Sequence, residues 1–162
     1  MTQKGYRRIG LAIGRADEES TQHRYSAGYL IERAETVTKQ SDQIPPLLFS
    51  FNPTREQGVT LLKSWVKHYQ LDAVIAHHNN IDGLLAEAGY EVPSDVGCAC
   101  LCIREGNDHL TGVRPNYHMI GVKAVSQLAT QIRIGERGIP EFSPQIYVRS
   151  EWQEGNSAPG KN

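Results

Sequence analysis

Two adjacent histidines, His77 and His78, stand where the chain leaves a short apolar strand at residues 73–76. They begin a polar corner, residues 77–80, at the place where open parallel sheets bind small molecules. Imidazoles hydrogen-bond hydroxyl groups and titrate near neutral pH. Because neighbouring residues at a strand end point in different directions, we expect at most one of the two to face a ligand. The alternatives are helix capping or solvent exposure, and a metal site would need a third ligand that the sequence does not identify.

Three cysteines, Cys98, Cys100 and Cys102, alternate along one apolar segment. In a strand this spacing places them on one face, about 6.5–7 Å apart. Parallel side chains at that separation do not suit a disulfide. A metal site would need thiolates that converge from a turn, with further ligands elsewhere. We therefore expect small core residues, with Cys102 as the one candidate for an exposed thiol.

Strands and helices alternate around these residues. Ser20 or Thr21 caps the first expected helix, Asn52 or Thr54 begins the second, and Gly89 ends the third with a positive φ. The expected strands are residues 8–13, 47–51, 73–76 and 96–103, and the expected helices are residues 20–38, 54–69 and 81–88. Four βα units of this length predict an α/β fold, a three-layer, doubly wound and mostly parallel sheet with right-handed crossovers.

The pattern changes after Arg104. A polar stretch, residues 104–112, interrupts the alternation. A long amphipathic helix follows over about residues 116–134 and ends at Gly135. A last strand is expected at residues 145–149, and the small, polar residues 156–162 predict a disordered tail.

Composition excludes several classes of protein. The 162 residues predict one domain, and 17 Lys and Arg against 18 Asp and Glu leave no electrostatic footprint for nucleic acid or an acidic membrane. No apolar run reaches the roughly 18–20 residues that span a bilayer, and no secretory signal is visible, so a cytoplasmic protein is expected. The motifs of phosphate loops, nucleophile elbows and dinucleotide sites are missing, so we expect no enzyme and no cofactor.

Six segments, taken together and in order, resemble the effector-binding region of LacI-type bacterial transcriptional regulators, whose fold is shared with periplasmic sugar-binding proteins. These segments are GYRRIGLAIG, RYSAGYL, LDAVIAHHN, EAGYEVPSDVG, LTGVRPNYHMIGVKAVSQL and IYVRSEW. They extend from residue 5 to about residue 154. Six such segments at matching spacings are a specific signal.

The resemblance implies a domain organisation and a function. Residues 1–155 would be the C-terminal lobe of the effector-binding domain, with the helix near 116–134 returning to an N-terminal lobe. The DNA-binding head and most of that N-terminal lobe have no counterpart in this chain. The implied function is to sense a sugar or related molecule, to form a homodimer, and to control DNA binding through lobe closure.

Operator DNA would be contacted only through the head, and no membrane is involved. The alternative is a sugar-binding protein of the periplasmic type without DNA function. A single lobe would also expose apolar surface and self-associate.

The resemblance also implies effector contacts between the lobes. Arg24 lies one residue before the position of the family's effector-binding arginine, and one residue turns a helical side chain by about 100°. Cys102 stands where the family has a sugar-binding aspartate, a loss for which Arg104, Asn107 or Asp108 could compensate. The implied effector contacts are Arg24, Phe51, Asn52, His77, His78, Cys102, Arg104 and Tyr117. These departures from the family indicate an effector other than a simple sugar.

Overall fold

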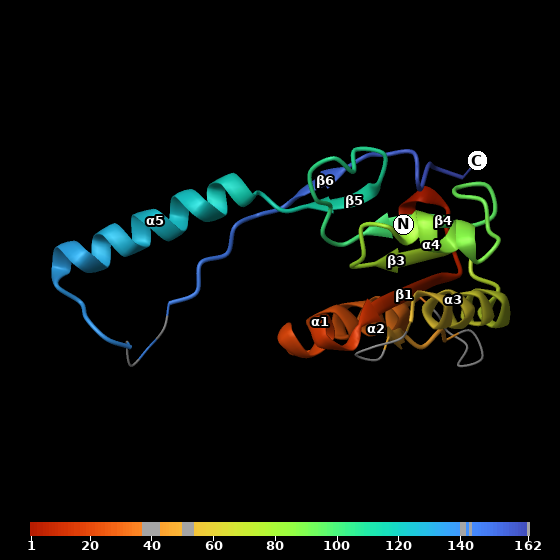
Figure 1. Cartoon of the computed structure of the whole chain (residues 1–162), viewed down its shortest axis with the longest axis horizontal. Helices are drawn as coiled ribbons and strands as arrows, with labels where there is room; N and C mark the ends of the chain where they lie inside the picture. The colour runs from red at the N-terminus through yellow and green to blue at the C-terminus, as the bar shows by residue number, and fades with distance from the viewer. Residues whose placement is uncertain (37–42, 50–53, 140–141, 143, 162) are drawn as a thin grey trace.

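The computed structural model describes residues 1–36, 43–49, 54–139, 142 and 144–161. Its centre is a single sheet with the strand order β2-β1-β3-β4-β5-β6 (Figure 1). The first five strands in the chain pair in parallel, and β6 pairs antiparallel with β5. The strands are β1 Ile9–Gly14, β2 Leu47–Phe49, β3 Ala73–Ala76, β4 Gly97–Cys100, β5 Thr111–Arg114 and β6 Glu151–Gln153. The expected α/β fold with a mostly parallel sheet is therefore confirmed.

The helices cover the sheet unevenly. They are α1 Arg15–Ser20, α2 Arg24–Thr36, α3 Arg55–Tyr69, α4 Ile81–Glu87 and α5 Tyr117–Ile134, after a 3-10 turn at Thr2–Lys4. The main apolar core joins Leu62 and Trp65 of α3 and Leu85 of α4 to alternate residues of the strands, such as Val74 and Cys98. A smaller cluster joins Ile9 of β1 and Ala73 of β3 to Tyr6 and Ala158, which lie outside the strands. No helix in the described part of the chain is long and apolar enough to cross a membrane.

Local signals place α3 and α4 where the sequence predicts them. The Thr54 hydroxyl accepts a hydrogen bond from the Gln57 amide, and Gln57 Oε1 accepts one from the Thr54 amide. This capping box satisfies two amides that a helix start leaves free. Gly89, with a φ of 89°, follows the last residues of α4 as expected.

The expected helix over residues 20–38 is wrong at its start. Gln22 and His23 have positive φ values of 54° and 60°, and they separate α1 from α2. Ser20 and Thr21 consequently lie at the end of α1, where both hydroxyls donate to the Asp17 carbonyl. Residues with a positive φ interrupt a right-handed helix, and the sequence carries no glycine there to signal it.

The carboxyl-terminal part departs most from expectation. Thr111–Arg114 forms β5 within and after the stretch expected to be polar and irregular. The last strand is Glu151–Gln153 and not residues 145–149, because the pairing with β5 begins at Glu151 opposite Arg114. Both differences have one cause, since each strand is stabilised by its neighbours more than by its own residues.

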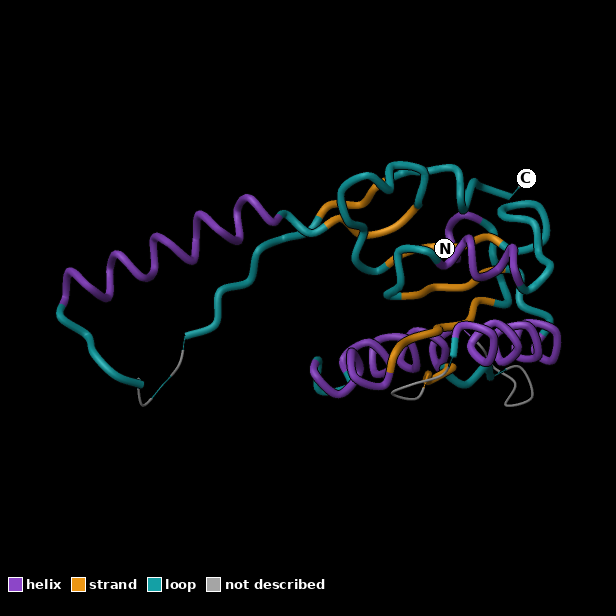
Figure 2. Tube along the Cα trace, viewed as in Figure 1, coloured by secondary structure: helices purple, strands orange, loops and turns teal. Residues whose placement is uncertain are grey.

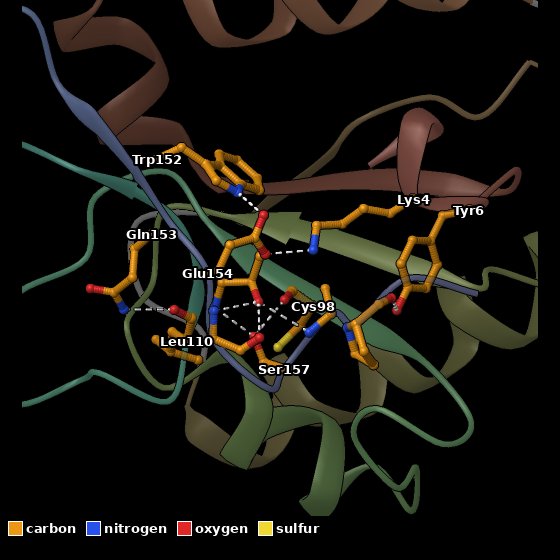
Figure 3. Close-up of polar contacts among 12 residues, drawn as sticks. Lys4, Tyr6, Cys98, Leu110, Trp152, Gln153, Glu154 and Ser157 are labelled. Atoms are coloured by element: carbon orange, nitrogen blue, oxygen red, sulfur yellow. Dashed lines mark hydrogen bonds and ion pairs between the residues drawn. The ribbon is translucent and has the colours of Figure 1, made fainter. Parts of the chain in front are cut away.

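The expectation of a disordered tail is also wrong for the described residues 156–161. Ser157 and Ala158 are buried. The Ser157 hydroxyl accepts from the Thr111 amide at 2.8 Å and donates to the Cys98 carbonyl at 2.8 Å. The Tyr6 hydroxyl donates to the Pro159 carbonyl at 2.9 Å, and Lys4 pairs with Glu154 (Figure 3). Small polar residues fit here because they satisfy backbone groups of β4 and β5.

The helix expected at residues 116–134 is confirmed as α5, capped by the Asn116 side chain and ended by Gly135. It projects away from the sheet, and a long loop brings the chain back to β6 (Figure 2). None of its residues is buried. The exposed apolar side chains include Tyr117, Val125, Leu128 and Ile132, which share one face of the helix.

Candidate functional site

A cleft of about 750 Å³ lies at the carboxyl ends of β1, β2 and β3. The strand ends contribute Gly14, Phe49 and Ala76, and the first turns of α1, α3 and α4 form further walls. The polar residues that line the cleft are Asp17, Thr54, Arg55, His77, His78, Asn79, Asn80, Arg104 and Asn107. Such a pocket, partly apolar and with convergent polar groups, has the features of a small-molecule site.

The two histidines occupy the cleft in different ways. His77 Nδ1 lies 3.4 Å from Asp17 Oδ2, and the His77 ring packs against the Tyr25 ring with centroids 5.5 Å apart. Burial raises the pKa of the Tyr25 hydroxyl, and the nearby Cys102 and Asp17 raise it further. His78 is exposed, and its Nδ1 accepts the Asn80 amide at 3.2 Å, at the start of α4. His77 thus lies beside an acid within the cleft, while His78 is exposed and bonds the backbone of the residue that precedes α4.

Asn79 joins the corner at residues 77–80 to the loop after β4. Its Nδ2 donates to the Cys102 carbonyl at 2.8 Å, and its Oδ1 accepts from the Arg104 amide at 2.8 Å. The Asn79 side chain therefore uses both its donor and its acceptor to fix the backbone around residues 102–104. The Arg104 side chain lines the cleft from this loop, as does Asn107.

The three cysteines differ in burial, as expected from the sequence. Cys98 and Cys100 are buried in the main core, and Cys102 is partly exposed. Burial raises the pKa of the Cys98 thiol to about 12 and also raises that of Cys100. Cys102 Sγ lies 3.1 Å from the Tyr117 hydroxyl, and this contact is the main reason that the pKa of Tyr117 is raised. Cys102 and Tyr117 contact each other and lie outside the set of residues that line the cleft.

Arg24 is not brought to the cleft. It is exposed, and its guanidinium donates to the Gln22 side chain at 3.3 Å. The break at Gln22 and His23 sets the direction of α2 and places Tyr25, the next residue, against His77. Phe51 and Asn52 lie outside the described residues, although Phe49 and Thr54 on either side of them line the cleft.

Sequence reasoning missed Asp17 and Arg55 as cleft residues, and it placed Asn79 in the corner at residues 77–80 without assigning it a role. Asp17 follows the carboxyl end of β1, so the argument that singled out His77 also applies to it. Arg55 lies in the first turn of α3 and forms an ion pair with Glu87. Among the residues that the structure describes, no group of three or more His, Cys, Asp or Glu side chains is arranged to hold a metal ion.

The sheet order, the cleft at its carboxyl edge and the helix that leaves and returns define a periplasmic-binding-protein-like fold of the LacI type. No model of a protein family matches the sequence, and no curated protein matches it. Among solved structures, the chain is similar to a transcription regulator from Lactobacillus plantarum, with a TM-score of 0.74 and 17% identity, over 99% of this chain and 62% of that one.

Two similar regulators were solved with sugars. A LacI family regulator from Enterococcus faecium with bound ribose has a TM-score of 0.68 and 14% identity, over 99% of this chain and 60% of that one. One from Lactobacillus casei with bound sucrose has a TM-score of 0.60 and 16% identity, over 97% and 59%. The chain spans less than two thirds of the length of these regulators. The fold expected from the six segments is confirmed.

Proposed function

We propose that the chain is the effector-sensing part of a LacI-type transcriptional regulator. The observation that carries this proposal is the cleft at the carboxyl edge of the sheet, with hydrogen-bonding side chains from the segments that follow four of the strands. Ribose and sucrose are bound by regulators with the same fold. The effector is accordingly a sugar or a sugar derivative.

The cleft has the groups that sugar binding needs. The Asp17 carboxylate can accept hydrogen bonds, and the Asn107 side-chain amide can both donate and accept them. The cleft can therefore bond a sugar hydroxyl as a donor or as an acceptor. Phe49, Ile81 and Leu84 provide apolar surface for the C–H face of a sugar ring. Asp17 lies 3.4 Å from His77 within the cleft and so orients the His77 ring.

The exposed face of α5 belongs to the same proposal. The regulators of this fold are longer than this chain, and an additional lobe would cover the apolar residues of α5 and close over the cleft. Effector binding would favour the closed arrangement of the two lobes and so change the placement of DNA-binding heads across a homodimer. Operator DNA is a partner of the heads and not of this chain.

A panel of sugars tests the sensing function. We expect one class to raise the melting temperature, because a ligand that binds only the folded state stabilises it. At about ten times the Kd the gain is about 1.4 kcal/mol, which corresponds to about 3–6 °C for a chain of this size. The measurement is a thermal unfolding scan with neutral pentoses, hexoses and disaccharides, and with their acidic derivatives.

The control separates the cleft from the rest of the surface. His77→Ala should abolish most of the stabilisation, while His68→Ala, at the far end of α3, should retain it. If no sugar or sugar derivative raises the melting temperature, the proposed function is wrong. If His77→Ala binds as well as the unmodified chain, the site assignment is wrong.

The exposed apolar face of α5 predicts that the 162-residue chain self-associates. We expect light scattering after size exclusion to detect species larger than a monomer, because Val125 and Leu128 are 69% and 57% exposed. The double variant Val125→Lys/Leu128→Lys should return the chain to a monomer. Ser126→Lys/Thr130→Lys adds the same charge on another face of the helix and should leave self-association unchanged. A monomeric unmodified chain would contradict this prediction.

A further inference from the structure

Arg104 is an exposed cation at the cleft, and its guanidinium has no counter-charge among the described residues. Its amide donates to Asn79 Oδ1 at 2.8 Å, and its carbonyl accepts from Asn107 Nδ2 at 3.3 Å. Its backbone is therefore held from two sides. Within the described part of the chain, no hydrogen bond or ion pair is made by its guanidinium, although the side chain lines the cleft.

The other charged groups near the cleft differ in whether they have a partner of opposite charge. Arg55 is paired with Glu87, whereas Asp17 lies 3.4 Å from His77, which balances a carboxylate only when it is protonated. On the loop that carries Arg104, Asp108 is paired with Arg114, and Glu105 is exposed and does not line the cleft. Asp17 is the one carboxylate among the described lining residues. Among the described lining residues, Arg104 is therefore the cation whose guanidinium has no carboxylate partner.

We propose that the effector is an acidic sugar, a polyol that carries a carboxylate or phosphate group, and that Arg104 binds this anionic group. The inference rests on the proposed sensing function and narrows its ligand class. A guanidinium donates two parallel hydrogen bonds to a carboxylate or phosphate and keeps its charge at all physiological pH values. Asn79 is the positioning residue, because it fixes the backbone from which Arg104 reaches into the cleft.

Matched pairs of ligands test the charge preference. The affinity of the chain for galactose is compared with that for galacturonate, and the affinity for glucose with those for gluconate and glucose 6-phosphate, by calorimetric titration. We expect the acidic member to bind at least about tenfold more tightly, because hydrogen bonds to charged groups are the stronger ones. Comparison of galacturonate and gluconate with glucose 6-phosphate shows whether the anionic group is a carboxylate or a phosphate.

The outcomes separate this inference from the proposed function. Equal binding of neutral and acidic sugars would overturn the inference and retain sugar sensing. Binding by no member of the panel would overturn both. An increase in salt from about 0.1 M to about 1 M, which shortens the screening length from about 10 Å to about 3 Å, should weaken acidic sugars only.

Variants assign the preference to Arg104. Arg104→Gln should lose the advantage of the acidic sugar, by about tenfold or more, and leave neutral-sugar affinity nearly unchanged. Arg104→Lys retains the charge and should retain part of the advantage. Lys67→Gln removes one positive charge from the exposed far end of α3 and should change neither. An Arg104→Gln variant that still prefers the acid would overturn the proposal.

Asn79→Ala tests the positioning role. We expect it to reduce the affinity for the acidic sugar and to add little to the effect of Arg104→Gln in the double variant, because both changes disable the same contact. Fully additive losses would mean that Asn79 acts on the ligand separately from Arg104.

Discussion

Gly112→Ala is expected to destabilise the fold by about 3 kcal/mol or more. Gly112 pairs with Cys100 of β4 and with Gln153 of β6, at a φ of +146°. A Cβ atom on Gly112 would lie 2.0 Å from the Cys100 carbonyl oxygen and 2.7 Å from the Cys100 amide nitrogen. These are backbone atoms, so the clash is relieved only if β5 moves away from β4.

Urea denaturation, followed by circular dichroism, measures this loss as a lower midpoint. Gly28→Ala is the matched control, because nothing lies within 4 Å of the added Cβ and Gly28 is in the middle of α2. That change should stabilise the chain by up to about 1 kcal/mol through helix propensity. A loss below about 1 kcal/mol for Gly112→Ala would show that the two strands do not approach each other so closely.

Ser157→Ala is expected to cost about 2–4 kcal/mol, although it deletes a single oxygen near the end of the chain. The Thr111 amide and the Cys98 carbonyl would both lose their 2.8 Å partner in a buried environment. Each buried polar group without a partner costs about 1–3 kcal/mol. The same denaturation experiment measures the effect.

Ser64→Ala serves as the comparison. The Ser64 hydroxyl donates to the Thr60 carbonyl at an exposed position of α3, and its loss should change the stability by no more than about 0.5 kcal/mol. If both serine variants have the same stability, the carboxyl-terminal segment does not stabilise the sheet. That result would support the prediction of a disordered tail.

Elements with strong local signals are predictable from the sequence. The β3 strand is found to the residue, because an apolar run is bounded by Asp72 and by the polar corner at His77. The α5 helix is found because Asn116 caps it, Gly135 ends it and its apolar residues recur at helical spacing. The edge that carries the cleft also follows from the sequence, since parallel strands present their carboxyl ends together.

Within the site, local reasoning places residues but not their partners. His77 and Arg104 are identified as candidates from position and resemblance, and both line the cleft. Arg24 is misplaced because the turn at Gln22 and His23 has no glycine to signal its positive φ values. The pairing of His77 with Asp17, sixty positions apart, needs the register of β1 against β3.

By itself, therefore, the sequence determined the class of fold, the order of its βα units and the edge of the sheet at which the cleft lies. Apolar periodicity and helix caps act over a few residues, and they are readable without the rest of the chain. The tertiary structure alone decided that Thr111–Arg114 is a strand, that Ser157 is buried, and that Asn79 bonds the backbone amide of Arg104. These three features depend on contacts between segments that are distant in the sequence. The contacts stabilise the fold through packing and through satisfied backbone groups, and they leave no local pattern in the sequence.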